Sequence, residues 1–283
     1  MAADVATARK GSSACWDIIE ADRFMSETAT YVYCIVHAAA SPKTTRVPSG
    51  LPGATRPSIV PVARSLWLAV AAVPLATYGS GPLETALRDM QWVADVAVAH
   101  EAVVEHFSRQ SGVAVIPMKL FTMFSSEERA VDQTRSRQRA IQTITRRIAG
   151  CEEWGVRVTR TLPAAPARRS AVARSSSGAA FLAAKKEARD LARGAALTAA
   201  VAADRVFTSL AAIARDARRR DDAPEGAAVP PVLDAAFLVP TSRRVRFKAA
   251  ARRLAAESAE AGAEITLSGP WPAYNFVEAG SRS

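Results

Sequence analysis

The stretch Thr30–Ala38, "TYVYCIVHA", carries the signal around which we build the fold. It is rich in β-branched and aromatic residues, which pack well on the pleated surface of a sheet. It contains no Asp, Glu, Lys or Arg, and a short apolar run of this kind predicts a buried strand. We therefore expect the first half of the chain to be organised around a sheet that contains this strand.

The segments after this strand alternate between loop, strand and helix signals. Residues 40–58 are dense in Pro, Gly, Ser and Thr and predict a loop. "SLWLAVAAV", from Ser65, predicts a second strand. From Pro82 to His106, apolar spacing predicts helical structure that is interrupted by one break. "GVAVIPMKL", from Gly112, predicts the next strand. This half therefore combines strands and helices.

A helix with recognisable ends closes the first half. Ser125 is followed three residues later by Glu128, which has the form of a capping box. Gly150 can adopt the left-handed conformation that ends a helix. The isoleucines that we expect on its buried stripe are Ile141, Ile144 and Ile148.

The second half repeats the alternation of strands and helices. "CEEWGVRVTR", from Cys151, predicts a strand, and residues 161–178 predict a linker. The remaining predicted elements are a helix over about 179–219, a strand over 232–240, an amphipathic helix through Leu254, and a last strand at 264–269. Strands separated by helices favour the α+β class, with α/β sandwiches of the split βαβ kind.

Composition limits the classes of function. The chain has 283 residues, 49% of them hydrophobic, and its longest apolar run is too short to span a membrane. The first 29 residues predict a flexible cytoplasmic extension without the apolar core of a secretory signal. Cys15, Cys34 and Cys151 are odd in number and widely spaced, which argues against disulfides and thiolate metal sites. The net charge of +10 keeps a nucleic-acid-binding regulator open as an alternative function, although the excess charge is diffuse.

The strongest candidate for chemistry is "HEAVVEHF", His100–Phe107. A zinc protease motif needs a second histidine four residues after the first, but that position is Val104. Glu101 and Glu105 share a helix face, yet such pairs are common on solvated helices. We predict no catalytic residue, metal site or cofactor, and expect His100 and Glu101 to orient this helix through hydrogen bonds. A hydrolase using these two residues is the alternative.

The C-terminal stretch "LSGPWPAYNFVE", Leu267–Glu278, predicts a stiff extended arm. Proline fixes its own φ angle and keeps the residue before it out of the α-helical region. Its aromatic side chains either dock on the C-terminal sheet or contact a partner. Together with nearby basic residues they form the candidate partner-binding set: Trp271, Tyr274, Phe276, Arg243, Arg246 and Lys248.

Six stretches, in order along the chain, resemble the GvpL/GvpF family of gas vesicle accessory proteins. They are "YVYCIV" at Tyr31, "HEAVVEHF" at His100, "VIPMKLFTMF" at Val115, "EEWGVRV" at Glu152, "SSGAAFLAAKK" at Ser176 and "GPWPAYNF" at Gly269. The chain departs from the family pattern at several positions. Cys34 replaces a glycine, Ala273 a proline and Asn275 a serine, and Leu120 and Phe121 replace a Phe-Gly pair, so a turn that glycine suits must be formed without it.

The resemblance implies a non-enzymatic protein needed to build gas vesicles. It implies an N-terminal α/β domain, which we assign to residues 30–150, and a C-terminal ferredoxin-like domain with long helices, which we assign to residues 151–283. It also implies binding to the hydrophobic gas vesicle shell protein and to other gas vesicle accessory proteins, in the cytoplasm and at the gas vesicle. We expect no membrane partner and no nucleic acid partner.

Overall fold

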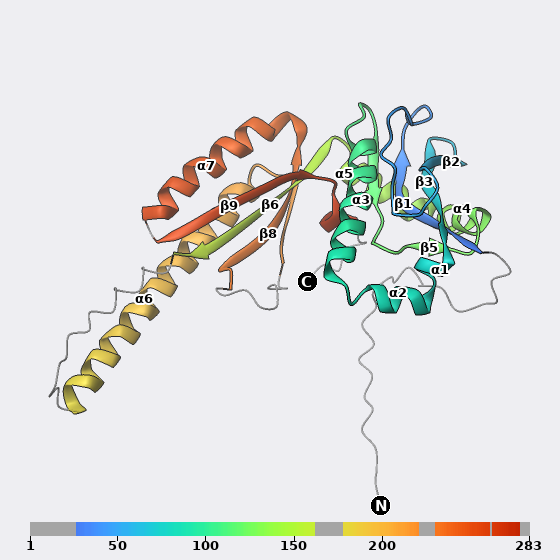
Figure 1. The fold of residues 1–283 in the computed structure, drawn as a ribbon. Coiled ribbons are helices and arrows are strands. Elements are labelled where there is room, and N and C mark those ends of the chain that lie inside the picture. Colours follow the sequence, from blue (N-terminus) through green and yellow to red (C-terminus); the bar gives the residue numbers. More distant parts are fainter. Residues whose placement is uncertain (1–26, 162–177, 221–229, 261, 278–283) are drawn as a thin grey trace, which may run out of the picture. The chain divides into compact units, whose positions relative to one another are not determined.

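A computed structural model describes residues 27–161, 178–220, 230–260 and 262–277 (Figure 1). The chain forms two compact units. Unit 1 comprises Met1–Ala149 together with Phe276–Ser283, and unit 2 comprises Gly150–Asn275. In the described part of the chain, no helix is long and apolar enough to cross a membrane.

Unit 1 is built on an antiparallel sheet in the order β2-β3-β1-β4, with β5 also paired to β1. The strands are β1 (Thr28–His37), β2 (Ser58–Ala63), β3 (Leu66–Pro74), β4 (Ala114–Pro117) and β5 (Met123–Phe124). β1 pairs with strands on both of its edges and is buried along almost its whole length. The buried strand expected from Thr30 is therefore confirmed.

Strand β2 corrects the sequence analysis, which predicted no strand between the loop and Ser65. β2 lies at the edge of the sheet and contains Pro61, where the register with β3 shifts. Proline lacks the N–H that a central strand needs, so it is confined to edges and bulges. The proline that weakens the strand signal is thus compatible with the place that β2 occupies.

The helices of unit 1 are α1 (Leu75–Tyr78), α2 (Ser80–Ala86), α3 (Met90–Ser108), α4 (Glu127–Ser136) and α5 (Gln138–Ile148). The expected break lies before α3, whose first turn is capped by the side chain of Asp89. The cap of α4 is Ser126 rather than Ser125, because the Ser126 hydroxyl accepts the N–H of Arg129. The single helix expected here is divided at Arg137.

Unit 2 has the element order β-α-β-β-α-β and the strand order β7-β8-β6-β9, with every pair antiparallel. This is the ferredoxin-like arrangement, as the resemblance implied. Its elements are β6 (Cys151–Arg160), α6 (Gly178–Ala211), β7 (Asp216–Arg219), β8 (Leu233–Pro240), the 3-10 turn η1 (Thr241–Arg243), α7 (Arg244–Glu260) and β9 (Ala263–Trp271).

Strand β7 is a second correction, because we predicted helix up to residue 219. The sequence "DARR" has no β-branched or aromatic residue, so local preference gives no strand signal. Instead, β7 pairs with β8, and the Arg219 guanidinium lies over the Phe207 ring, 4.4 Å from its centre. Tertiary pairing therefore decides this element.

The core of unit 2 lies between one face of the sheet and helices α6 and α7. Its largest members are Trp154, Phe237 and Phe247, whose rings pack against one another. Helix α6 contributes Ala203, Val206 and Leu210, all from its second half. Only that half of α6 is needed to cover the sheet.

The first half of α6 extends beyond the sheet of unit 2 (Figure 1). We call residues 182–198 the free segment of α6. Its leucines are Leu182, Leu191 and Leu197, whose exposed fractions are 65, 69 and 68%. Every residue from Lys185 to Thr198 is exposed, whereas Ala199 begins the buried part. The helix is continuous through Gly194.

Candidate partner-binding surface

His100 lies in the core of unit 1, where it contacts the strand that opens the family pattern. Its Nδ1 lies 2.7 Å from the hydroxyl oxygen of Tyr31, and both side chains are buried. Burial lowers the pKa of His100 to about 4, so the ring is neutral at pH 7. The hydrogen bond ties α3 to β1, which confirms the orienting role expected for this histidine.

Tyr33 fixes the loop that follows β1 in a similar way. Its hydroxyl accepts the backbone N–H of Leu51 at 3.0 Å. Gly50 has φ +80°, and a Cβ at that position would lie 2.4 Å from the Tyr33 hydroxyl. A side chain at residue 50 would therefore displace Tyr33. The "YVY" motif thus places two buried tyrosines that position a helix and a loop.

The turn at Phe121 keeps a left-handed backbone although it has no glycine. Phe121 has φ +63°, in the region that favours glycine. Its ring stacks on that of Trp92, with the ring centres 6.0 Å apart and the planes 4° apart. The aromatic contact offsets part of the cost of this conformation.

The described residues hold no cluster of three His, Cys, Asp or Glu side chains suited to a metal ion. Cys34 is fully buried, and burial raises the pKa of its thiol well above its ordinary value. Cys34 therefore packs as a small buried hydrophobe. Cys151 is half-buried, and Cys15 lies outside the described residues.

The C-terminal arm is held by Asn275. The Glu153 carboxylate accepts the backbone N–H of Asn275 at 2.8 Å and also its side-chain amide. The Arg218 guanidinium donates to the Asn275 carbonyl oxygen at 2.7 Å. Glu153 is 3% exposed, and burial raises its pKa. Polar contacts that the sequence analysis did not foresee therefore dock the arm.

Two family motifs meet at this point of unit 2. Trp271 pairs with Glu153 across the β6–β9 ladder. Gly155, in the "EEWGVRV" motif, lies so close to β9 that a Cβ would be 2.6 Å from the Ser268 hydroxyl. The "EEWGVRV" stretch and the start of the "GPWPAYNF" stretch thus pair with each other in the sheet.

The three aromatic candidates of the arm differ in exposure. Trp271, at the end of β9, is 45% exposed. Tyr274 is half-buried and Phe276 is fully buried, both in a 3-10 turn (Tyr274–Phe276). Contacts assign Phe276 to unit 1, where the Arg147 guanidinium donates to its carbonyl oxygen. Of the three, Trp271 offers the most accessible surface.

The three basic candidates lie at the start of α7 or just before it. Arg243 donates to the carbonyl oxygen of Ile213 at 3.1 Å, and the Lys248 ammonium lies 5.6 Å from the centre of the Trp154 ring. Arg246 is exposed. β8 ends where α7 is about to begin, and the pairing register places Trp271 at this same end of the sheet. The structure thus gathers these basic residues and Trp271 at one end of unit 2.

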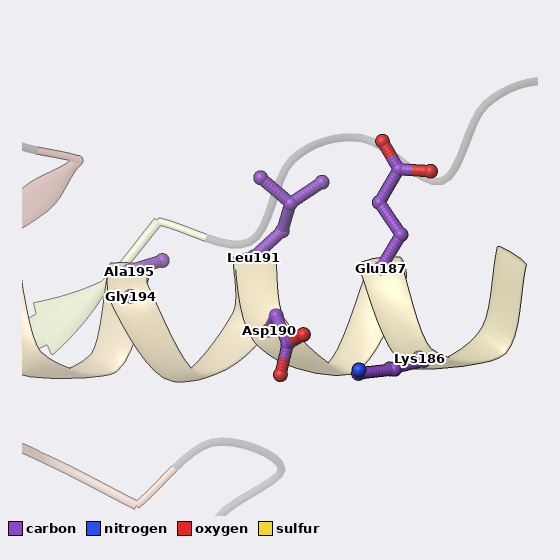
Figure 2. A pocket seen from close by; sticks show the side chains of 6 residues that line it. All are labelled: Lys186, Glu187, Asp190, Leu191, Gly194 and Ala195. Carbon is purple, nitrogen blue, oxygen red and sulfur yellow. The ribbon is translucent and has the colours of Figure 1, made fainter. Parts of the chain in front are cut away.

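The sequence analysis did not foresee that the free segment of α6 exposes three leucines. A hollow of about 640 Å³ lies along this segment, and the described residues that line it all belong to α6 (Figure 2). Leu191 and Glu187 project to the same side in this view. Helical periodicity does not reveal this surface, because the exposed leucines look like core residues in the sequence.

Comparisons with known proteins agree with this architecture. The family model "Gas vesicle synthesis protein GvpL/GvpF" matches residues 29–278. "Gas vesicle protein L" of Streptomyces sp. (strain CB03234) is 31% identical over 216 residues, which cover 73% of this chain and 77% of the relative.

Two solved structures share the fold. The gas vesicle protein GvpF of Anabaena sp. PCC7120 has a TM-score of 0.62 at 15% identity, covering 90% of this chain and 98% of that one. GvpF of Microcystis aeruginosa has a TM-score of 0.59 at 13% identity, covering 88% and 99%. The chain belongs to the GvpL/GvpF family of gas vesicle synthesis proteins.

Proposed function

We propose that this chain is a non-enzymatic assembly factor that binds the hydrophobic gas vesicle shell protein and other accessory proteins as a chaperone or adaptor. Family membership supports the gas vesicle role. The observation that carries the binding role is the free segment of α6, whose three leucines are 65–69% exposed. At about 100° per residue, Leu182 and Leu197 lie on one side of the helix and Leu191 on the other, so both sides of the free segment offer an aliphatic side chain to another protein.

The physical purpose follows from the nature of the partner. A subunit that polymerises through apolar surfaces aggregates when those surfaces are left uncovered. A factor with its own accessible apolar surface can cover the subunit until it is added to the growing shell. The site of action in this proposal is the cytoplasm and the surface of the forming gas vesicle.

Two accessible surfaces of unit 2 are the proposed contact regions. The first is the free segment of α6. The second is the end of the sheet with Trp271 and the basic residues Arg243, Arg246 and Lys248. Tyr274 is half-buried and Phe276 is buried in unit 1, so Trp271 is the aromatic side chain of the arm that this second surface presents.

Co-purification of the shell protein with this chain, both expressed together, tests the proposal. We expect the double variant Leu191→Glu/Leu197→Glu to recover at least about tenfold less shell protein, because each leucine contributes on the order of 1 kcal/mol to such a contact. The substitutions lie at exposed positions and should leave the fold intact.

The matched control is Lys185→Ala/Arg189→Ala, which changes the net charge of the same exposed helix by the same amount without removing a large apolar side chain. If the wild-type chain recovers no shell protein in any background of accessory proteins, the proposal is wrong. If both double variants lose binding equally, charge rather than apolar contact explains the loss, and the role of the leucines is wrong.

A further inference from the structure

A groove of about 460 Å³ lies between the end of α6 and the first turns of α7. On the α6 side it is lined by Ser209, Ala212 and Ile213, and on the α7 side by Ala249 and Ala250. Ala212 and Ala249 are exposed. A floor of such small residues allows another polypeptide backbone to approach closely.

Two arginines flank the α7 side of this floor. Arg246 and Arg253 both line the groove, and their Cα atoms are about 10 Å apart because seven helical residues rise about 1.5 Å each. Both arginines and the two alanines between them lie on one face of α7, since residues three, four and seven apart share a face. The groove thus has an apolar floor between two cations.

The charge around the groove is unbalanced. Among the described residues, Arg246 makes no ion pair. Arg253 is 69% exposed, and its Nε lies 3.6 Å from a Glu257 oxygen. The same carboxylate pairs with Arg205 at 2.8 Å. The Glu257 carboxylate therefore pairs with two guanidinium groups while Arg246 has no acidic partner in the described part of the chain, and the remaining positive charge favours an acidic occupant.

We infer that this groove binds a helical segment of a partner protein that carries two acidic side chains about seven residues apart, with small apolar residues between them. The acidic side chains pair with Arg246 and Arg253, and the small residues lie on Ala249 and Ala250. This inference rests on the proposed function, because it assigns a docking surface for one of the accessory proteins of the gas vesicle. It adds a surface distinct from the free segment of α6.

The chemistry of the floor favours a polypeptide over a nucleic acid. Single-stranded nucleic acid is typically held by aromatic side chains on which its bases stack, and no aromatic residue lines this groove among the described residues. Two arginines with small apolar residues between them match a helix that carries acidic side chains seven residues apart with small residues between them, since residues three, four and seven apart share a face.

Photo-crosslinking in gas-vesicle-forming cells tests this inference. A photoreactive amino acid replaces Ala249 in the full chain, and mass spectrometry identifies the crosslinked peptide. We expect a peptide from a gas vesicle protein with acidic residues about seven apart. We expect Arg246→Glu/Arg253→Glu to lower its yield by about tenfold, since like charges then face each other. Replacing the two acids of the captured peptide by lysine should restore the yield.

Arg252→Glu is the control, because Arg252 is exposed on α7 and does not line the groove. Its crosslinking yield should match that of the wild type. Capture of nucleic acid, of a peptide without paired acidic residues, or of nothing overturns the inference. Co-purified shell protein measured in the same cells separates the outcomes: if it persists while the groove captures nothing, the groove assignment fails and the proposed function stands.

Discussion

The opening motifs of unit 1 and the last motif of unit 2 differ in exposure. In unit 1 the motifs point inward: Tyr31 and His100 meet in the core and are almost fully buried. In unit 2 the last motif is docked through Asn275 but leaves Trp271 45% exposed, and α6 carries exposed leucines. The difference indicates that the unit 1 motifs maintain a scaffold, and we propose that partner contact is concentrated on unit 2.

The pH dependence of unit 1 gives the largest expected effect. The pKa of His100 is about 4 in the folded chain, below its ordinary value of 6.5, so protons bind preferentially to the unfolded chain. The stability that the neutral ring provides is present above pH 6.5 and is lost as the pH falls toward 4. We expect a loss of about 3 kcal/mol at pH 4.

Hydrogen exchange of the β1 amides at pH 7 and pH 4, after correction for intrinsic rates, measures this loss. The variant His100→Gln should show a much smaller change between the two pH values, because it cannot be protonated. An equal change in wild type and variant would mean that His100 is not the titrating group, and the inward role of this motif would be weakened.

The contact between Glu153 and Asn275 gives the next largest effect. Glu153→Ala leaves two donors of Asn275 without their acceptor, and we expect unit 2 to lose about 2 kcal/mol of stability. Urea unfolding of the single variants and the double variant with Asn275→Ala should show coupling of about 1 kcal/mol. Glu264→Ala, at an exposed position of β9, is the control. Additive effects at residues 153 and 275 would show that the arm is not held by this contact.

The turn at Phe121 gives a smaller effect with a defined sign. Phe121→Ala removes the ring stacking on Trp92 and keeps the cost of φ +63°, whereas Phe121→Gly removes both. The glycine variant should therefore be more stable than the alanine variant by about 1 kcal/mol. Thermal unfolding compares the two variants. A more stable alanine variant would contradict the left-handed conformation of this turn.

Trp271→Ala gives the smallest expected effect on stability and the sharpest test of the outward role. The side chain is 45% exposed at the end of a strand, so we expect a loss of no more than about 1 kcal/mol. Recovery of shell protein should nevertheless fall several-fold. A variant that unfolds would show instead that Trp271 serves the fold, as the buried Phe276 does.

Strong local signals predicted the central elements of the fold. β1, β6 and β8 are apolar or β-branched over most of their length, and the sequence placed them correctly. Three strands were missed. β2 and β7 lie at the edges of their sheets, where pairing with a neighbour outweighs local preference, and β5 is only two residues long and pairs with β1. The cap was misplaced by one residue because the capping-box pattern favours Ser125, which has Glu128 three residues later, whereas the Ser126 hydroxyl accepts the N–H of Arg129.

The candidate surface was less accessible to sequence reasoning. Aromatic content identified Trp271, but sequence cannot tell an exposed tryptophan from the buried Phe276 five residues later. Apolar residues recur along the whole of α6, but only its second half packs on the sheet. The sequence of a helix does not show how much of its length a sheet will cover. The contact between Glu153 and Asn275 joins residues 122 positions apart, and no local sequence pattern predicts a contact over that separation.

The most direct test of the account is the solubility of the shell protein when it is diluted from denaturant with an equimolar amount of this chain. We expect the shell protein to stay in the supernatant after centrifugation with the wild-type chain, and to pellet with the Leu191→Glu/Leu197→Glu variant as it does alone. Shell protein that pellets equally in all three samples would contradict the claim that this chain holds it.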